Sequence, residues 1–386
     1  MIMPLSYKKN LVFAAACLGM LLFGIGLITL GSVAGNLKTK FVLDEFSAGT
    51  LFSIMPFGIL TGSLLFGPIC DKYGYKIILI IACLGMCAGF EGIAYVSSLS
   101  LLKLFIFIFG VSGGIINGAT NAVVADITAE AKAANLNLLG VFFAIGALGM
   151  PFILGFLKKD FSFEQILSSV GVLTFAIAVF FLFIQFPASK KSQGFALAKS
   201  SSFLKDEIII FIAFYLFCQS SFEAIINNWT TTYLTKQLSV TESNALYALS
   251  LFVVGMAVMR LLSGSVLRTV SPKKILIASF VLILAGIIFL KYTQAFYFAV
   301  AGLILLGAGL ANGFPVMLGI TGGRYTERSG TAFSFVLVVA LIGNMLVNYL
   351  MGIIANRYGI HQLINVALIE LFVMIMLSVF IFKRVK

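Results

Sequence analysis

The sequence predicts an all-α membrane protein with twelve transmembrane helices in two pseudo-symmetric six-helix bundles. Three observations lead to this prediction: the composition, the number of apolar tracts, and a weak repeat between the two halves. Of the 386 residues, 61% are hydrophobic and 10% are charged, with a mean hydropathy of +1.10. Soluble domains are about 45–50% apolar and about 25% charged, so the chain is predicted to lie in a lipid bilayer.

The apolar tracts are long enough to cross a bilayer, which takes about 20 residues. They fall near residues 11–36, 47–69, 77–97, 101–125, 136–157, 163–186, 207–235, 243–264, 274–291, 295–320, 330–355 and 361–382. The connections are short except for Pro187 to Asp206, which is rich in serine and lysine. We therefore expect an N-terminal bundle (1–186), a cytoplasmic linker (187–206) and a C-terminal bundle (207–386).

The charge distribution predicts the orientation. The net charge is +12, and the excess of lysine and arginine in cytoplasmic loops of membrane proteins explains it without a nucleic-acid partner. With the N-terminus inside, cytoplasmic segments carry about twice as many lysines and arginines as the other side. Lys8 and Lys9 precede an apolar run that is too long for a cleaved signal peptide. We expect a monomer in the cytoplasmic (inner) membrane, with both termini in the cytoplasm.

Several classes of function are not expected. The five cysteines lie in or beside apolar tracts and show neither a disulfide framework nor a zinc spacing. The sequence has no phosphate-binding Gly-x-x-x-x-Gly-Lys-Ser/Thr loop and no metal-hydrolase motif. We therefore expect no enzyme activity, no cofactor and no metal site.

The two halves of the chain repeat weakly. At a shift of 197 residues, residues 67–77 match 264–274, Gly58 matches Gly255 and Gly155 matches Gly352. At a shift of 195, Asn117-Gly118 matches Asn312-Gly313. Such repeats are typical of secondary transporters, in which the substrate site lies between the halves near the bilayer midplane.

The segment from Gly67 to Lys76 resembles the loop signature Gly-x-Leu-x-Asp-Arg-x-Gly-Arg-Lys of the major facilitator superfamily. Gly67, Asp71, Gly74 and Lys76 match it, while Lys72 and Tyr75 replace arginine. Together with the layout of six and six helices, the resemblance covers the whole chain. It implies alternating access of a central site to the two sides of the membrane.

Within the superfamily the chain is most similar to the fucose-permease-like sugar transporters. The resemblance rests on residues 117–121, 125–128 and 136–139, and on Glu223 with Trp229 and Tyr233. It implies a small polar solute, a sugar or polyol, that moves with a proton. The sequence departs from this group at Asn117, where fucose permeases have a glutamate, and in tract 11–36, which has no acid. Three alternatives stay open: an exporter of drugs or amphipathic metabolites, a proton-independent uniporter, and a membrane sensor.

A polar stripe in tract 207–235 is the leading candidate for a functional site. Gln219, Glu223, Asn227 and Thr230 fall on one face at 100° per residue. Such a stripe must face protein or water rather than lipid, so we expect it to line a solute pathway. A charged side chain here costs about 2.5–3.5 kcal/mol, which makes Glu223 the candidate for proton coupling and solute binding. The alternative is a glutamate that only packs against a neighbouring helix.

Other solute-binding candidates are mostly amides, which both donate and accept hydrogen bonds. They are Asn36, Asn117, Asn121, Asn312, Asn344 and Asn348, together with Asn227 and with Trp229 as a stacking platform for a sugar ring. Asn36 is expected to share a helix face with Thr29 and Ser32. The alternatives are hydrogen bonds between helices and, for Trp229, an anchor at the membrane boundary.

The remaining charged residues have other expected roles. Asp71 and Arg260 lie near cytoplasmic helix ends and resemble gating residues. Glu91 and Glu370 lie on helices that are peripheral in the superfamily, and we expect them to pack. His361, beside an outer loop, is expected to be solvated.

Overall fold

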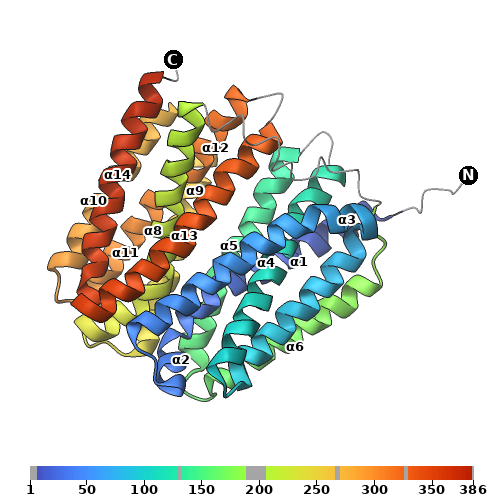
Figure 1. Cartoon of the computed structure of the whole chain (residues 1–386), viewed down its shortest axis with the longest axis horizontal. Coiled ribbons are helices and arrows are strands. Elements are labelled where there is room, and N and C mark those ends of the chain that lie inside the picture. The colour runs from blue at the N-terminus through green and yellow to red at the C-terminus, as the bar shows by residue number, and fades with distance from the viewer. Residues whose placement is uncertain (1–6, 128–131, 188–205, 266–269, 326–328, 385–386) are drawn as a thin grey trace, which may run out of the picture. The chain divides into compact units, whose positions relative to one another are not determined.

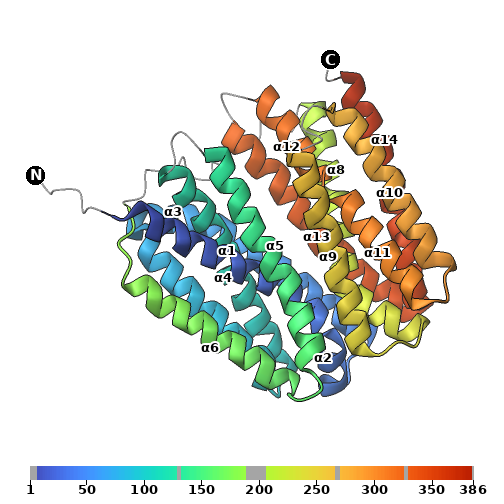
Figure 2. The same cartoon turned by 180° about the vertical axis from the view of Figure 1, so that it is seen from behind.

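The computed structural model describes residues 7–127, 132–187, 206–265, 270–325 and 329–384, which are almost entirely helical and contain no β-strand. The helices are α1 (Lys9–Ser32), α2 (Ala34–Phe41), α3 (Glu45–Tyr95), α4 (Leu99–Ile127), α5 (Lys132–Leu157), α6 (Phe163–Leu182), α8 (Glu207–Gln237), α9 (Glu242–Ser265), α10 (Pro272–Tyr292), α11 (Phe296–Leu310), α12 (Gly313–Arg324), α13 (Ser329–Tyr358), the short 3-10 helix η4 (Ile360–Gln362) and α14 (Leu363–Arg384). Figures 1 and 2 show these helices from opposite sides.

Twelve segments of the described ranges are long and apolar enough to span a bilayer, which confirms the predicted number. Two of them lie in α3, because the helix continues through the loop signature and is kinked at Gly74. Gly74 has φ +79° and ψ 167°, a conformation that glycine adopts readily and other residues avoid. The glycine of the signature is therefore required by the backbone at this kink.

Two predicted helices are interrupted. α1 ends at Ser32, Val33 leaves the helical conformation, and α2 starts at Ala34. Asn36 therefore lies on α2, whereas Thr29 and Ser32, with which it was expected to share a helix, lie on α1. The tract predicted at 295–320 is likewise divided into α11 and α12, with Ala311 and Asn312 between them.

The chain forms two compact units. The N-terminal unit comprises Met1–Val33 and Ile54–Gly194, and the C-terminal unit comprises Ala34–Ser53 and Phe195–Lys386. In the N-terminal unit α1 packs on α4 and α5. In the C-terminal unit α8 packs on α13 and α14, while α11 packs on α9 and α10. The expected bundles differ from these units in residues 34–53, because α2 and the first turns of α3 pack with the C-terminal helices.

Each unit contains close backbone contacts between its own helices, and these contacts correspond at the shift found in the sequence. A side chain at Gly58 would come within 2.5 Å of the Phe107 carbonyl oxygen, and one at Gly255 within 2.3 Å of that of Ile304. Phe107 and Ile304 are themselves 197 residues apart. The same shift relates Gly110 to Gly307, where a side chain would come within 2.3 Å of the Met55 carbonyl oxygen and within 2.0 Å of that of Phe252, respectively. Small residues let membrane helices approach closely. Each unit therefore contains the same tight helix pair, α3 with α4 and α9 with α11.

Candidate functional site

Two polar side chains donate hydrogen bonds to backbone carbonyls at the interruption between helices α11 and α12, which is called the break below. Gln219 Nε2 of α8 donates to the carbonyl oxygen of Leu310 at 2.8 Å, and Arg260 Nε of α9 donates to that of Ala311 at 3.4 Å. In an unbroken helix the Ala311 carbonyl would accept the N–H four residues later. That position is Pro315, which has no N–H. Because buried carbonyls need donors, the two side chains stabilise the break by replacing missing helix bonds.

Glu223 lies one helical turn after Gln219 and is half-buried. Arg260 acts on it as an opposite charge. The same arginine therefore links the carboxyl on α8 to the break before α12. An opposite charge lowers the cost of a carboxylate inside a membrane segment, where ionisable residues usually mark ion or solute pathways.

Asn227 continues the polar stripe of α8 and has unused bonding capacity. Its side chain is 6% exposed, and its Oδ1 has no hydrogen-bond partner among the described residues. Thr230, one turn further, is also buried. A buried acceptor without a donor costs about 1–3 kcal/mol, and a hydroxyl donor from a bound molecule would remove this cost. Asn312, at the break, is likewise buried and occupies the N-cap position of α12 without a side-chain cap bond.

The second group of candidates joins α8 to α13. Asn348 is fully buried, and its Oδ1 accepts from Trp229 Nε1 at 3.3 Å and from Asn228 Nδ2 at 3.2 Å. Its Nδ2 donates to the Asn344 carbonyl oxygen at 2.9 Å and lies 3.2 Å from Asn344 Oδ1. The hydrogen-bonding groups of Asn348 are thus all engaged by protein. Asn344 itself is half-buried.

Trp229 is fully buried and is contacted by side chains of three other helices, α2, α3 and α13. The Phe52 ring packs edge-on against it with centroids 5.2 Å apart, and Lys38 Nζ lies 5.1 Å from its centroid. Asn348 holds the indole nitrogen. In this arrangement neither lipid nor solvent reaches the ring, because protein groups occupy its surroundings.

A charge cluster, Lys38 with Glu45 and Lys236, adjoins the tryptophan. Lys38 Nζ donates to Glu45 Oε2 and to Thr232 Oγ1, the latter at 3.2 Å, and Lys236 Nζ donates to Glu45 Oε1 at 2.6 Å. Burial lowers the pKa of Lys38 below its ordinary value, and the Glu45 carboxylate opposes this shift by favouring the charged ammonium. Sequence reasoning missed this cluster, which connects α2 and the start of α3 to the end of α8.

The candidates of the N-terminal unit are the amides of α4. Asn121 Nδ2 donates to the Asn117 carbonyl oxygen at 2.8 Å, lies 3.0 Å from Asn117 Oδ1, and contacts Met20 Sδ at 3.9 Å. Both amides are half-buried. The hydroxyls of Thr29 and Ser32 bond to carbonyls of their own helix. The structure thus brings Asn117 and Asn121 together beside α1, whereas Asn36 lies in the other unit and is half-buried.

The gating candidates are only partly described. The Asp71 side chain lies outside the described part of the structure. Nearby, Tyr75 donates its hydroxyl to Asp126 Oδ2 at 2.7 Å, and Lys76 Nζ donates to the Leu182 carbonyl oxygen at 2.6 Å. The loop signature is therefore tied to the ends of α4 and α6. Arg260 is placed at the helix break described above.

The two acids that were expected to pack, Glu91 and Glu370, each have a serine partner on another helix. The Ser168 hydroxyl of α6 lies 2.9 and 3.0 Å from the two carboxyl oxygens of Glu91, which supplies the partner that the sequence did not reveal. Glu370 of α14 contacts the hydroxyl of Ser221 on α8. Glu91 therefore connects two helices of the N-terminal unit, and Glu370 connects two helices of the C-terminal unit. His361 is exposed beside Gln362.

The described residues contain no cluster of three or more histidine, cysteine or acidic side chains that could hold a metal ion. The polar groups of the site are instead amides, hydroxyls, the opposite charges of Glu223 and Arg260, and the Lys38–Glu45–Lys236 cluster. Such groups suit hydrogen bonding to a small solute rather than bond-breaking chemistry.

Comparison with known proteins agrees with the fold. A sequence profile of the Major Facilitator Superfamily matches residues 16–249 and 216–386. The chain is similar to the crystal structure of a D-xylose-proton symporter, with a TM-score of 0.81 and 15% sequence identity. The superposition covers 99% of this chain and 100% of the symporter chain. At that identity the likeness concerns the fold alone.

Curated relatives point to more than one kind of cargo. The multi-drug resistance efflux pump PmrA of Streptococcus pneumoniae is 29% identical over 134 residues, which is 35% of this chain and 34% of the pump, so that match spans about a third of each protein. Sodium-dependent glucose transporter 1 of Homo sapiens is 23% identical, and the aligned region covers 89% of this chain and 73% of the human transporter. The chain, a multi-pass membrane protein and not an enzyme, belongs to the Major Facilitator Superfamily of transporters.

Proposed function

We propose that this transporter moves a small polar solute, a sugar or a polyol, across the cytoplasmic membrane by alternating access and together with a proton. The observation that carries the proposal is the polar stripe of α8, in which Asn227 keeps a buried, unpartnered acceptor beside Glu223. The amides Asn117 and Asn121 supply further donors and acceptors. Groups of this kind match a polyhydroxylated molecule, and the human relative and the structural neighbour are named for glucose and xylose.

Binding is tested by a thermal-shift screen of the purified protein against a solute library, followed by a matched pair of variants. Asn227→Ala removes the unpartnered acceptor, whereas Asn365→Ala removes an exposed amide on α14. We expect the first variant to weaken affinity by about 1–3 kcal/mol and the second to leave it unchanged. Unaltered affinity with lowered thermal stability of the Asn227 variant would assign this residue to packing.

Coupling is tested at Glu223. Each elementary charge that crosses the membrane gains about 2.3 kcal/mol per 100 mV, so one proton can drive accumulation. Glu223→Gln keeps the shape of the side chain but cannot ionise, and we expect it to lose accumulation while retaining counterflow. Accumulation with the wild-type pH dependence would remove Glu223 as the coupling site and favour a uniporter or, as the name of the human relative suggests, sodium coupling.

The second candidate function is export of drugs or amphipathic metabolites. The partial match to an efflux pump supports it. An exporter should raise the drug resistance of cells that express it, whereas an importer should support growth on its solute. A sensor would bind its solute saturably without flux.

The orientation, the monomeric state and the gate are further parts of the proposal. The excess of lysine and arginine in the segments on one side of the predicted helices supports a cytoplasmic location of both termini. A reporter that is active only outside the cytoplasm should be silent when fused after Lys386, and light scattering of the purified protein should give one chain per particle. Asp71→Asn should impair transport and leave solute binding near normal if Asp71, with Arg260, controls access from the cytoplasm.

A further inference from the structure

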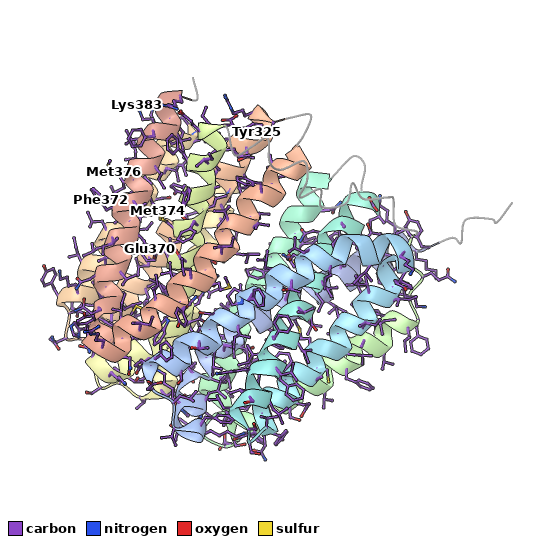
Figure 3. The ribbon with its side chains drawn as sticks, viewed as in Figure 1. Tyr325, Glu370, Phe372, Met374, Met376 and Lys383 are labelled. Atoms are coloured by element: carbon purple, nitrogen blue, oxygen red, sulfur yellow. The ribbon has the colours of Figure 1, made fainter. Side chains whose placement is uncertain are left out.

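A second buried carboxyl lies between α14 and α8. Glu370, labelled in Figure 3, is 6% exposed, and its Oε1 contacts the hydroxyl of Ser221. Its other oxygen, Oε2, has no hydrogen-bond partner among the described residues. Ser221 and Glu223 are two residues apart on α8, so their side chains leave the helix in roughly opposite directions. The Glu370 pair is therefore distinct from the polar stripe.

A count of hydrogens at Ser221 indicates which group donates. Its oxygen lies 2.8 Å from the Phe217 carbonyl oxygen and 3.1 Å from that of Cys218, and it also contacts Glu370. A hydroxyl has one hydrogen to give. If that hydrogen bonds the Phe217 carbonyl, the Ser221 oxygen can only accept from Glu370, which must then carry a proton. An ionised Glu370 would instead take the hydrogen from the carbonyl and leave a buried charge with one donor, at a large desolvation cost.

No charged group of the packed elements compensates a negative charge at Glu370. α14 packs on α8, α10, α13 and η4. On α8, Glu370 acts electrostatically on the thiol of Cys218, and the cation Lys236 is exposed. The charged and histidine side chains of the other elements and of α14 itself are exposed: Lys273, Lys274, Lys291, Arg357, His361, Lys383 and Arg384. The pair thus lacks the opposite charge that Glu223 has in Arg260.

We propose that Glu370 and Ser221 form a reversible proton-binding site in the C-terminal unit. While α8 and α14 are packed, the Oε1–H of Glu370 donates to Ser221. When the helices separate enough to admit water, that O–H bond breaks, the proton passes to water, and the carboxylate is left hydrated. The Ser221 hydrogen then turns from the Phe217 carbonyl to the carboxylate. Proton occupancy and helix packing are linked, because the proton favours the packed arrangement.

Glu91 provides a matched contrast within the same chain. Ser168 lies within hydrogen-bond distance of both Glu91 oxygens, and the acid is half-buried rather than buried. It lies on α3 in the N-terminal unit, whereas α8 and α14 belong to the C-terminal unit. The Glu91 pair is thus another glutamate–serine contact between membrane helices, and it serves as the control in both experiments below.

Infrared spectroscopy of the purified wild-type protein tests the proton directly. We expect a carbonyl band of a protonated carboxyl at neutral pH that decreases reversibly as pH is raised. In a Glu223→Gln background, where the other proposed proton carrier contributes no band, Glu370→Gln should abolish this band, Ser221→Ala should shift it to higher frequency, and Glu91→Gln should leave it unchanged. A band that persists in Glu370→Gln in this background, or one that stays constant over the whole pH range in which the protein is folded, overturns the proposal.

Transport by the same single substitutions in the wild-type background separates proton exchange from packing. Glu370→Gln can still donate to Ser221 but cannot release a proton, so we expect it to bind solute and lose uptake. Glu91→Gln should keep uptake and its pH dependence. Uptake by Glu370→Gln with the wild-type pH profile overturns the proposal, even if the carboxyl proves to be protonated. Because Glu223 is unchanged in these variants, failure here leaves the proposed coupling at Glu223 standing.

Discussion

The charge cluster beside Trp229 makes a sharp prediction, because this residue is the only tryptophan of the chain and reports its own surroundings by fluorescence. The perturbation is Glu45→Gln, which removes the carboxylate between Lys38 and Lys236. The side chains of Glu45 and Lys38 are 11% and 14% exposed, whereas that of Lys236 is 57% exposed. Lys236→Gln is therefore the matched control, since it removes a contact of the same carboxylate at the exposed side.

The expected magnitudes follow from these exposures. Removing one partner of a buried ion pair destabilises a protein by about 3–5 kcal/mol, because the other charge stays buried and uncompensated. An exposed pair contributes about 0–1 kcal/mol. Lys38 also loses part of its fixed position over the Trp229 ring, a contact that contributes about 0.5–2 kcal/mol when desolvated. We therefore expect Glu45→Gln to lower stability by about 3 kcal/mol and Lys236→Gln by less than about 1 kcal/mol.

The assay is thermal and denaturant unfolding of the protein in detergent, followed by Trp229 emission, with quenching by iodide measured in the folded state. In Glu45→Gln we expect a red-shifted emission and stronger quenching, because Lys38 no longer holds its place against the indole. In Lys236→Gln both should resemble the wild type. Equal destabilisation by the two variants, or unchanged quenching in Glu45→Gln, would refute the reasoning that burial of the Lys38–Glu45 pair keeps Trp229 covered.

Three further predictions rest on single contacts. Asn348→Ala should lower the free energy of unfolding by about 1–3 kcal/mol, because it leaves the buried indole N–H of Trp229 without an acceptor. Asn344→Ala should lower it less. A selective loss of solute affinity in Asn348→Ala would instead assign Asn348 to the binding site. Gly307→Ala should destabilise by about 1–3 kcal/mol through overpacking against α9, whereas Gly319→Ala, which meets open space, should be neutral in the same thermal unfolding measurement. Tyr75→Phe removes a hydrogen bond to a carboxylate of α4 and should lower stability by about 1.5–3 kcal/mol; unchanged unfolding would show that the bond is replaced by water.

The features that could be predicted from sequence depend on local information. The number of spans follows from tract length and hydropathy, and the repeat appears as matching glycines because close helix contacts require small side chains at fixed positions. Gly58 and Gly255 were paired by the shift of 197, and the structure places both against backbone carbonyls that are related by the same shift. The kink at Gly74 likewise belongs to a signature that can be recognised residue by residue.

The partners of polar groups could not be predicted, because they depend on contacts between distant segments. Glu45 and Lys236 are 191 residues apart, and Glu91 and Ser168 are 77 apart. In the sequence Lys236 only contributes to the charge balance that sets orientation. Pro315 was a visible signal for the broken helix, since it removes a backbone donor. Which side chains would bind the freed carbonyls depended on how α8 and α9 pack against α11.

The two units have corresponding backbone contacts between their own helices but different arrangements of polar residues. This difference indicates which residues are expected to couple transport and which to select the solute. The glycine contacts of α3 with α4 recur in α9 with α11 at one shift, because helix packing tolerates few alternatives. Beyond Gly307 the correspondence changes: α4 continues unbroken past Asn117, whereas the C-terminal unit breaks at Asn312 and fixes the break with Gln219 and Arg260. Broken helices near the midplane are the usual sites of solute and ion binding in transporters built from repeats. Arg260, which acts on Glu223 as an opposite charge, donates a hydrogen bond to the break, while the N-terminal unit offers uncharged amides on an unbroken helix. We therefore expect substitutions around the break to alter coupling and those at the α4 amides to alter solute selectivity, a division that uptake and counterflow measured on both sets of variants would test.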